Sequence, residues 1–142
     1  MIIFESPNGF IIDNPSADEL KADMIYGFPD YWHQGNGAAT ITYVGDKKNK
    51  CLLLILPSYE HGIYLKHLTI DDGRITEEWL SLEDSQKLDL CAECSNEWLA
   101  SIGLFLPLEK AWVAIYDFLL TGDRSIQIDW TKPELMPEDS NW

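Results

Sequence analysis

The 142-residue sequence has few basic residues and no long apolar run. Lys and Arg number 10 against 24 Asp and Glu, which gives a formal net charge of −14 at pH 7. Nucleic acids and anionic membranes attract basic surfaces, so we expect neither as a direct ligand. No apolar run approaches the roughly 20 residues of a membrane-spanning helix, and the N-terminus lacks the basic and then apolar pattern of a secretory signal. These absences predict a cytoplasmic protein.

Cysteine is also scarce, with only Cys51, Cys91 and Cys94. In a reducing cytosol we expect three free thiols. Cys91 and Cys94 form a single C-x-x-C motif, and the sequence has no second such pair and no H-x-x-x-H motif to complete a zinc site. We therefore predict no metal and no other cofactor. A small metal-binding enzyme that adds His61 and His67 to the C-x-x-C pair stays open as an alternative.

The common catalytic motifs are missing as well. The sequence has neither a G-x-x-x-x-G-K-[ST] nor a G-x-G-x-x-G phosphate-binding loop, and neither G-x-S-x-G nor H-E-x-x-H occurs. His33 falls in a loop, His61 in a turn and His67 in a predicted strand, where we interpret it as an outward-facing polar residue. The sequence therefore predicts a protein that is not an enzyme.

Half of the net charge falls in the middle of the chain. Residues 60–98 contain ten acidic residues against Lys66, Arg74 and Lys87, and Trp79 and Trp98 lie among them. Aromatic side chains supply contact area and carboxylates steer a cationic partner, so this pattern is typical of a surface that binds a basic protein. A solvated acidic face with core aromatics behind it fits the pattern equally well, and the charge alone also serves solubility.

Hydrophobic periodicity predicts a helix followed by a meander of strands. Ser16 and Glu19 form a capping box, with a helix from Ala17 to Tyr26. Asp71-Asp72-Gly73 is a hairpin turn. Strands are expected at residues 2–4, 39–44, 51–56, 63–70 and 74–82, with Pro57 ending the run over 51–56, and residues 10–13 form a second apolar run. Residues 88–98 fit neither a helix nor a strand clearly.

The last third of the chain predicts a helix, a tight turn and a strand. Pro107 suits the first turn of the helix, and Gly122 suits the left-handed position at its end. The apolar stripe between them consists of Leu108, Ala111, Trp112, Ile115, Phe118 and Leu119. Residues 125–130 then alternate, with Ile126, Ile128 and Trp130 on one face.

These elements together predict the fold class. We expect residues 1–130 to form a single α+β domain, with a mainly antiparallel sheet packed against two helices. Residues 131–142 are acidic and contain two prolines, so we expect them to form a loose C-terminal tail.

The C-terminal helix and strand also carry a recognisable signature. It consists of Pro107 and Ala111 where the helix starts, Phe118 and Gly122 where it ends, and Trp130 at the close of the strand. This order resembles the C-terminal signature of an immunity protein family from bacterial polymorphic toxin systems, the family conventionally numbered first. The matched segment covers about a fifth of the chain.

A second segment supports the resemblance. The Asn14-Pro15-Ser16 lead into the first helix resembles the opening of this family, whereas Arg124-Ser125 stands where the family often has Arg-Pro. The resemblance implies a cytoplasmic protein that binds a cognate toxin domain and blocks it. Toxins of this kind are commonly nucleases or nucleic-acid deaminases, whose clefts are basic because they hold phosphate. An acidic protein over such a cleft would compete with nucleic acid.

We therefore predict a monomeric or weakly dimeric protein that binds a basic toxin domain through the middle of its chain. An acidic interaction module with an unrelated partner is the alternative. The predicted interface combines turns with acidic and aromatic stretches: Asp30, Tyr31, Trp32, Tyr59, Glu60, Asp71, Asp72, Glu77, Glu78, Trp79, Glu93, Glu97 and Trp98.

Overall fold

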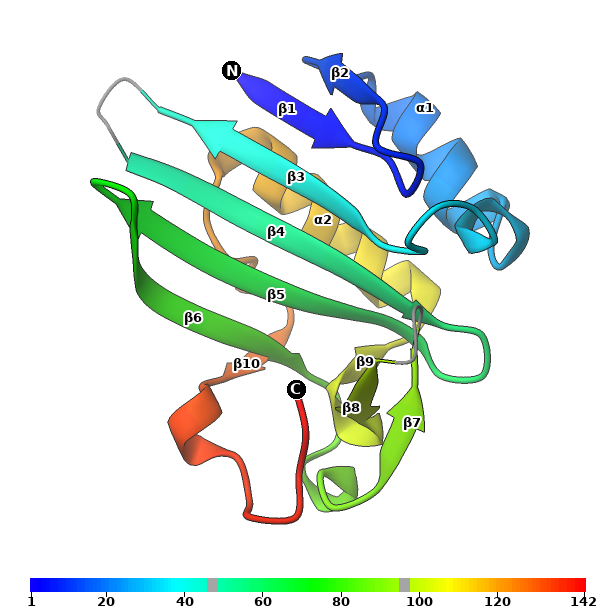
Figure 1. The fold of residues 1–142 in the computed structure, drawn as a ribbon, viewed down its shortest axis with the longest axis vertical. Helices are drawn as coiled ribbons and strands as arrows, with labels where there is room; N and C mark the ends of the chain where they lie inside the picture. The colour runs from blue at the N-terminus through cyan, green and yellow to red at the C-terminus, as the bar shows by residue number, and fades with distance from the viewer. Residues whose placement is uncertain (46–48, 95–97) are drawn as a thin grey trace.

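The chain forms a long antiparallel sheet that has both helices on one side (Figure 1). The computed structural model describes residues 1–45, 49–94 and 98–142. Within these residues the strands follow the order β10-β6-β5-β4-β3-β1-β2, β9 pairs with β5, and β7 pairs with β8 in a separate small sheet. The predicted fold class, α+β with a mainly antiparallel sheet, is confirmed.

Most elements lie where the periodicity predicts them. The strands are β1 (Ile2–Glu5), β2 (Ile11–Asp13), β3 (Ala39–Val44), β4 (Asn49–Ser58), β5 (Gly62–Asp71), β6 (Arg74–Leu82), β7 (Cys91–Glu93), β8 (Leu99–Ser101), β9 (Phe105–Leu106) and β10 (Asp129–Thr131). The helices are α1 (Ala17–Lys21), which continues as a wider π-helical turn over Ala22–Tyr26, and α2 (Leu108–Thr121). Short 3₁₀ turns lie at Asp30–Trp32, Ser85–Lys87, Ile102–Leu104 and Pro133–Leu135.

The end of β4 and the turn between β5 and β6 test two predictions made from the sequence. Pro57 was expected to end β4, and this is wrong, because the strand continues to Ser58. β3 stops at the Ala39–Ile55 pair, so the side of Pro57 that lacks an N–H has no strand to bond. The predicted hairpin turn is confirmed, with Asp72 and Gly73 both at positive φ (50° and 77°).

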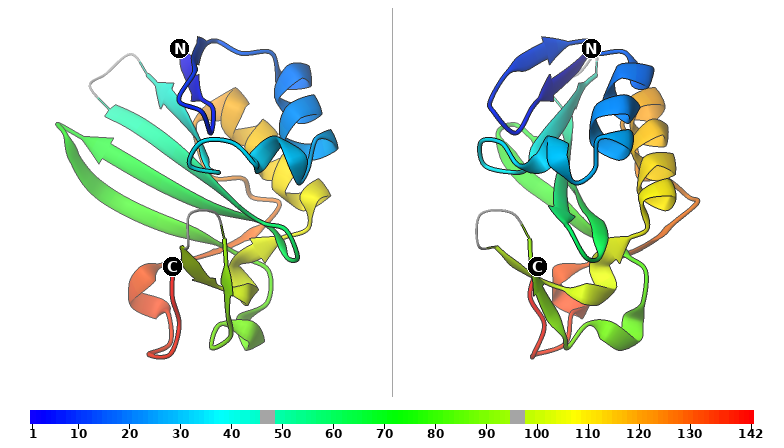
Figure 2. Two further views of the ribbon diagram at one scale, coloured as in Figure 1. Left: turned by 45° about the vertical axis from the view of Figure 1, so that its right-hand side comes forward. Right: turned by 90° about the vertical axis from the view of Figure 1, so that its right-hand side faces the viewer.

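The larger core lies between α2 and the sheet (Figure 2). Five residues of α2 are buried: Ala111, Ala114, Ile115, Phe118 and Leu119. Leu108 and Trp112, at the margin of the predicted stripe, are only partly buried. The helix ends as predicted at Gly122, which has φ of 75° and donates its N–H to the Phe118 carbonyl at 2.7 Å.

A smaller core lies at the lower end of the sheet in Figure 1, on the face away from α2. β7, β8 and the turn after them cover this end, and its buried residues are Leu56, Tyr64, Leu80, Leu88, Cys94, Ala100, Leu104 and Phe105. The C-terminal segment closes over the same core. Asn141 accepts a hydrogen bond from Ser101 N at 2.9 Å and donates one to Ser101 Oγ at 3.0 Å. The expectation of a loose tail is therefore wrong.

The predicted strand over residues 125–130 is also wrong, because β10 covers only Asp129–Thr131. Ser125 Oγ accepts from Gln127 N at 3.1 Å and donates to Asp117 at 2.6 Å. These local bonds replace a strand ladder with a turn. As a result Ile126 is 98% exposed, whereas Ile128 is buried.

Candidate functional site: the open face of the sheet

One face of the central strands is not covered by the helices. Leu53 and Ile55 of β4 and Leu65 of β5 lie in the core beneath α2. Successive side chains of a strand point to opposite faces, so Leu52 and Leu54 point away from α2. Both helices lie behind the opposite face, and the strands β3 to β6 face the viewer in Figure 1.

Cross-strand pairing sets the side chains of this face in rows. Thr42, Leu52, Leu68 and Glu78 lie opposite one another on β3 to β6, and Thr40, Leu54 and Lys66 form the adjacent row. We define the open face by the members of these and the flanking rows: Ile3, Glu5, Thr40, Thr42, Val44, Lys50, Leu52, Leu54, Lys66, Leu68, Ile70 and Glu78.

The chemistry of the open face is unusual for a sheet surface in contact with water. An antiparallel sheet with one covered face normally alternates apolar and polar residues. Here Leu52, Leu54, Leu68, Ile70 and Val44 are aliphatic and only partly buried. The continuous apolar run of β4 is typical of a strand that is covered on both faces. The sheet thus has a partly exposed aliphatic surface at its centre, with the exposed Lys50 between Val44 and Ile70.

Charged residues limit this aliphatic surface at its lower end. Lys66 is only 8% exposed, and its Nζ lies 3.3 Å from the Glu78 carboxylate and 5.2 Å from the centroid of the Trp98 ring. A buried ammonium requires such partners, because desolvation of an unpaired charge is costly. A hollow lies between Trp98 and the sheet, with Leu54 and Thr40 in its wall. Trp98, which is 44% exposed, therefore lies at the border of the open face.

The predicted interface residues separate into distinct regions. Glu78 and Trp98 lie on or beside the open face, as described above. Asp71 and Asp72 are exposed at the far tip of the β5–β6 hairpin, and Glu93 is exposed on β7. Glu97 lies outside the described residues.

A second region lies where the Asp30–Trp32 turn meets the β4–β5 turn. His33 packs edge-on against Tyr59, with ring centroids 4.6 Å apart, and this contact joins the two segments. Asp30, Tyr59 and Glu60 are exposed there. Tyr31 is partly buried, and burial together with the nearby Asp23 raises the pKa of its hydroxyl to about 12.

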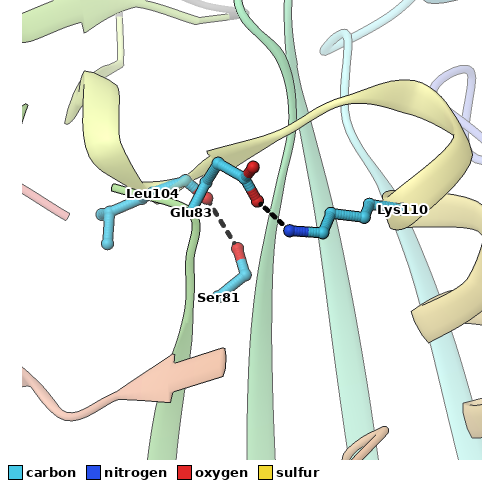
Figure 3. Close-up of polar contacts among 4 residues, drawn as sticks. All are labelled: Ser81, Glu83, Leu104 and Lys110. Atoms are coloured by element: carbon cyan, nitrogen blue, oxygen red, sulfur yellow. Dashed lines mark hydrogen bonds and ion pairs between the residues drawn. The ribbon is translucent and has the colours of Figure 1, made fainter. Parts of the chain in front are cut away.

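The β4–β5 turn also borders an acidic hollow that the sequence analysis missed. Glu60, Glu83 and Asp84 lie in its wall together with His61 and Lys87. Figure 3 shows two bonds beside it: Lys110 Nζ of α2 donates to Glu83 Oε2 at 2.9 Å, and Ser81 Oγ of β6 donates to the Leu104 carbonyl in the Ile102–Leu104 turn at 2.7 Å. Because Glu83 and Asp84 lie in a polar connection between elements, only the fold brings them beside Glu60.

Two of the predicted aromatic contacts lie away from the open face. Trp32 is 1% exposed, and its Nε1 donates to the Met24 carbonyl at 3.2 Å. Trp79 points to the helix side of the sheet, where the Arg124 guanidinium lies 3.7 Å and the Lys132 ammonium 4.5 Å from its ring centroid. Glu77, two residues away, shares that side and is separated from Glu78 by the sheet.

His67 was expected to face outward, and this is wrong. It is 4% exposed on the helix side, with Phe118 and Trp130 packed edge-on at 5.6 and 6.3 Å between ring centroids. Its Nε2 lies 3.0 Å from the Gly122 carbonyl, which assigns the proton to Nε2. Burial lowers the pKa of His67, so the neutral imidazole is the stable form in the folded protein.

The residues of the metal-enzyme alternative do not converge. His67 contacts α2, whereas Cys94 belongs to the smaller core on the opposite face of the sheet. Cys91 is exposed. Among the residues that the structure describes, no group of three or more His, Cys, Asp or Glu side chains is placed to hold a metal ion.

Comparison with protein families, with curated proteins and with solved structures found no match to this chain. No helix within the described ranges is both long and apolar enough to cross a membrane.

Proposed function

We propose that the chain is an immunity protein, a stoichiometric inhibitor that binds a cognate toxin domain in the cytoplasm. The observation that carries this proposal is the open face: an aliphatic, uncovered sheet surface on a protein with a net charge of −14. Such a surface serves binding of another macromolecule rather than catalysis.

The open face has the composition of a protein interface. Interfaces combine an apolar centre that is depleted of charge with a polar rim. Leu52, Leu54 and Leu68 form the centre, and the charged residues Glu78, Lys50 and Glu5 lie at the margin. Fully burying a Leu side chain contributes about 1.5–3 kcal/mol, and these leucines are already mostly buried, so covering the exposed part contributes about 0.1–1 kcal/mol for each.

The charge selects the kind of partner. A net charge of −14 repels a second copy of this chain and attracts a cationic protein from a distance. A nuclease or deaminase cleft is cationic because it binds phosphate. The resemblance of residues 106–130 to the immunity protein family supports this class of partner.

The residues of that resemblance have structural roles on the helix side. Ala111 and Phe118 are buried in the larger core, and Trp130 packs against it. Pro107 precedes α2 and Gly122 ends it. These five residues therefore account for the fold on the helix side, and the proposed interface lies on the opposite face of the sheet.

The test starts with the gene that lies immediately upstream of this one. Its product should inhibit growth when expressed alone, and co-expression of this chain should restore growth. The two purified proteins should form a one-to-one complex. A neighbouring product that is harmless, or that forms no complex, would contradict the immunity function and favour the alternative of an interaction module with an unrelated partner.

Two matched variants then test the open face itself. Leu52→Glu places a charge at its centre and should weaken the complex by at least about 100-fold, as loss of a central contact does. Ile126→Glu, at a residue 98% exposed outside the open face, should leave affinity unchanged. Full affinity of a folded Leu52→Glu variant would exclude the open face.

A charge reversal tests the electrostatic contribution. Changing Asp71 and Asp72 to Lys at the hairpin tip should slow association and leave folding intact, because exposed turn charges contribute little stability. The slowing should shrink as salt rises. An unchanged association rate at low salt would remove the hairpin tip from the interface.

A further inference from the structure

The edge strand β2 and the residue before it carry the most exposed run of large apolar residues in the described chain. Phe10, Ile11 and Ile12 are consecutive and are 70%, 68% and 45% exposed. β2 is the last strand in the order of the sheet, at the rim beside α1 in Figure 1. Consecutive exposed apolar residues on a sheet edge usually mark a contact surface.

The pairing of β2 with β1 leaves part of its backbone unbonded. Ser6 N donates to the Phe10 carbonyl at 2.9 Å, and Asn14 N donates to the Ile2 carbonyl at 2.7 Å. In an antiparallel ladder the bonded residues alternate, so residues 10, 12 and 14 bond β1. The N–H and C=O groups of Ile11 and Asp13 therefore point outward, where another strand can pair with them.

A groove with carboxylates in its wall lies beside this edge. Phe10 and Ile12 line it from the β2 side, and Leu20, Glu19 and Asp23 line it from the side of α1 and its continuation. Neither carboxylate has a Lys, Arg or His partner within 4.0 Å among the residues that the structure describes. The groove thus offers an apolar floor and unpaired negative charge.

We infer that β2 binds an extended segment of a cationic protein, which pairs with Ile11 and Asp13 as an additional strand and places apolar and basic side chains over the groove. Backbone pairing supplies affinity, and alternate side chains supply specificity. A second copy of this chain is a poor occupant, because edge pairing would bring two proteins of charge −14 together. The inference does not depend on the open face or on the identity of the toxin.

The experiment uses the full chain and three synthetic ten-residue peptides. One alternates valine and lysine, the second has the same sequence with alternate amide nitrogens methylated, and the third has glutamate in place of lysine. Titration calorimetry measures affinity, and amide chemical shifts locate the bound peptide. The valine–lysine peptide should shift the amides of residues 10–14, and the other two should bind at least about 10-fold more weakly.

Protein variants separate strand pairing from nonspecific charge attraction. Ile11→Pro removes an outward N–H without breaking the β1–β2 ladder, and Ile11→Val retains that N–H. Ile11→Pro should lose at least about 10-fold in affinity, and Ile11→Val should keep it. Glu19→Gln with Asp23→Asn should weaken binding, whereas Asp18→Asn, outside the groove, should not.

Three results would overturn the inference. They are equal binding of the valine–lysine peptide to the Ile11→Pro variant, shifts outside β2 and the groove, and no binding up to about 1 mM peptide. A dimer that forms through β2, seen by sedimentation and abolished by Ile11→Pro, would assign the edge to a second copy instead.

Discussion

Gly122 permits a quantitative test of how α2 is fixed to the sheet. Its φ is 75°, and a β-carbon at this position would lie 2.6 Å from ring atoms of Tyr43. A left-handed backbone costs a residue other than glycine about 1–2 kcal/mol. Extra volume in a packed contact costs about 1–3 kcal/mol. We therefore expect Gly122→Ala to lower the free energy of unfolding by about 2–5 kcal/mol.

Gly73 supplies the matched control. Its φ is 77°, nearly that of Gly122, but a β-carbon there would meet no atom within 4 Å. Gly73→Ala should therefore cost only the backbone term, about 1–2 kcal/mol. Urea denaturation measures the free energy of unfolding of both variants, and its dependence on urea concentration should be the same as in the unsubstituted protein. In a Tyr43→Ala background the extra cost of Gly122→Ala should disappear. Equal losses for the two glycine variants, or an extra cost that survives Tyr43→Ala, would refute the contact.

Three further outcomes follow from burial and its effect on ionisation. Phe118 is 1% exposed, so Phe118→Ala should lower the free energy of unfolding by about 3–5 kcal/mol. Trp112 is only partly buried, so Trp112→Ala should lower it by only about 1–2 kcal/mol. Equal losses for the two variants in thermal and urea unfolding would contradict this difference. Because burial lowers the pKa of His67, the unfolded state binds its proton first, so stability should fall as pH drops below about 6.5 and His67→Gln should flatten that slope. Burial, more than the nearby Glu93, raises the pKa of Cys94 to about 11, so a thiol reagent should modify the exposed Cys91 first, and elemental analysis should find no bound zinc.

Local signals predicted much of the fold. The capping box places Ser16 Oγ as acceptor of the Glu19 N–H, Gly122 ends α2, and Asp72-Gly73 makes the hairpin. Each depends on a few adjacent residues, so the sequence contains the whole cause. Alternation also located β3, and a continuous apolar run located β4.

Features that depend on distant contacts were not predictable in the same way. The residues before His67 do not define a polar face of the strand: one face carries Ile63 and Leu65, and the other carries Tyr64 and Lys66. Periodicity therefore could not assign the imidazole of His67 to the helix side. Trp32 reads as a loop aromatic, and only its bond to the Met24 carbonyl reveals a core role. The C-terminal tail has a disorder-like composition, yet Asn141 pairs with Ser101 of β8.

The candidate site shows the same limit. The composition pointed to acidic and aromatic residues, whereas the open face depends on which side of β4 the helices cover. The run from Cys51 to Leu56 is apolar throughout, so the sequence does not distinguish Leu52 and Leu54 from Leu53 and Ile55. Only the placement of α2 separates the two sets.

The most direct test of the proposed interface is methyl cross-saturation NMR on this chain in complex with the product of the upstream gene. Saturation of the partner should transfer to the methyl groups of Leu52, Leu54 and Leu68 on the open face. The methyl groups of Leu53 and Ile55, adjacent in the same strand but beneath α2, should receive none. Transfer confined to other surfaces, with no signal at Leu52 and Leu54, would contradict the open face as the site that binds the toxin.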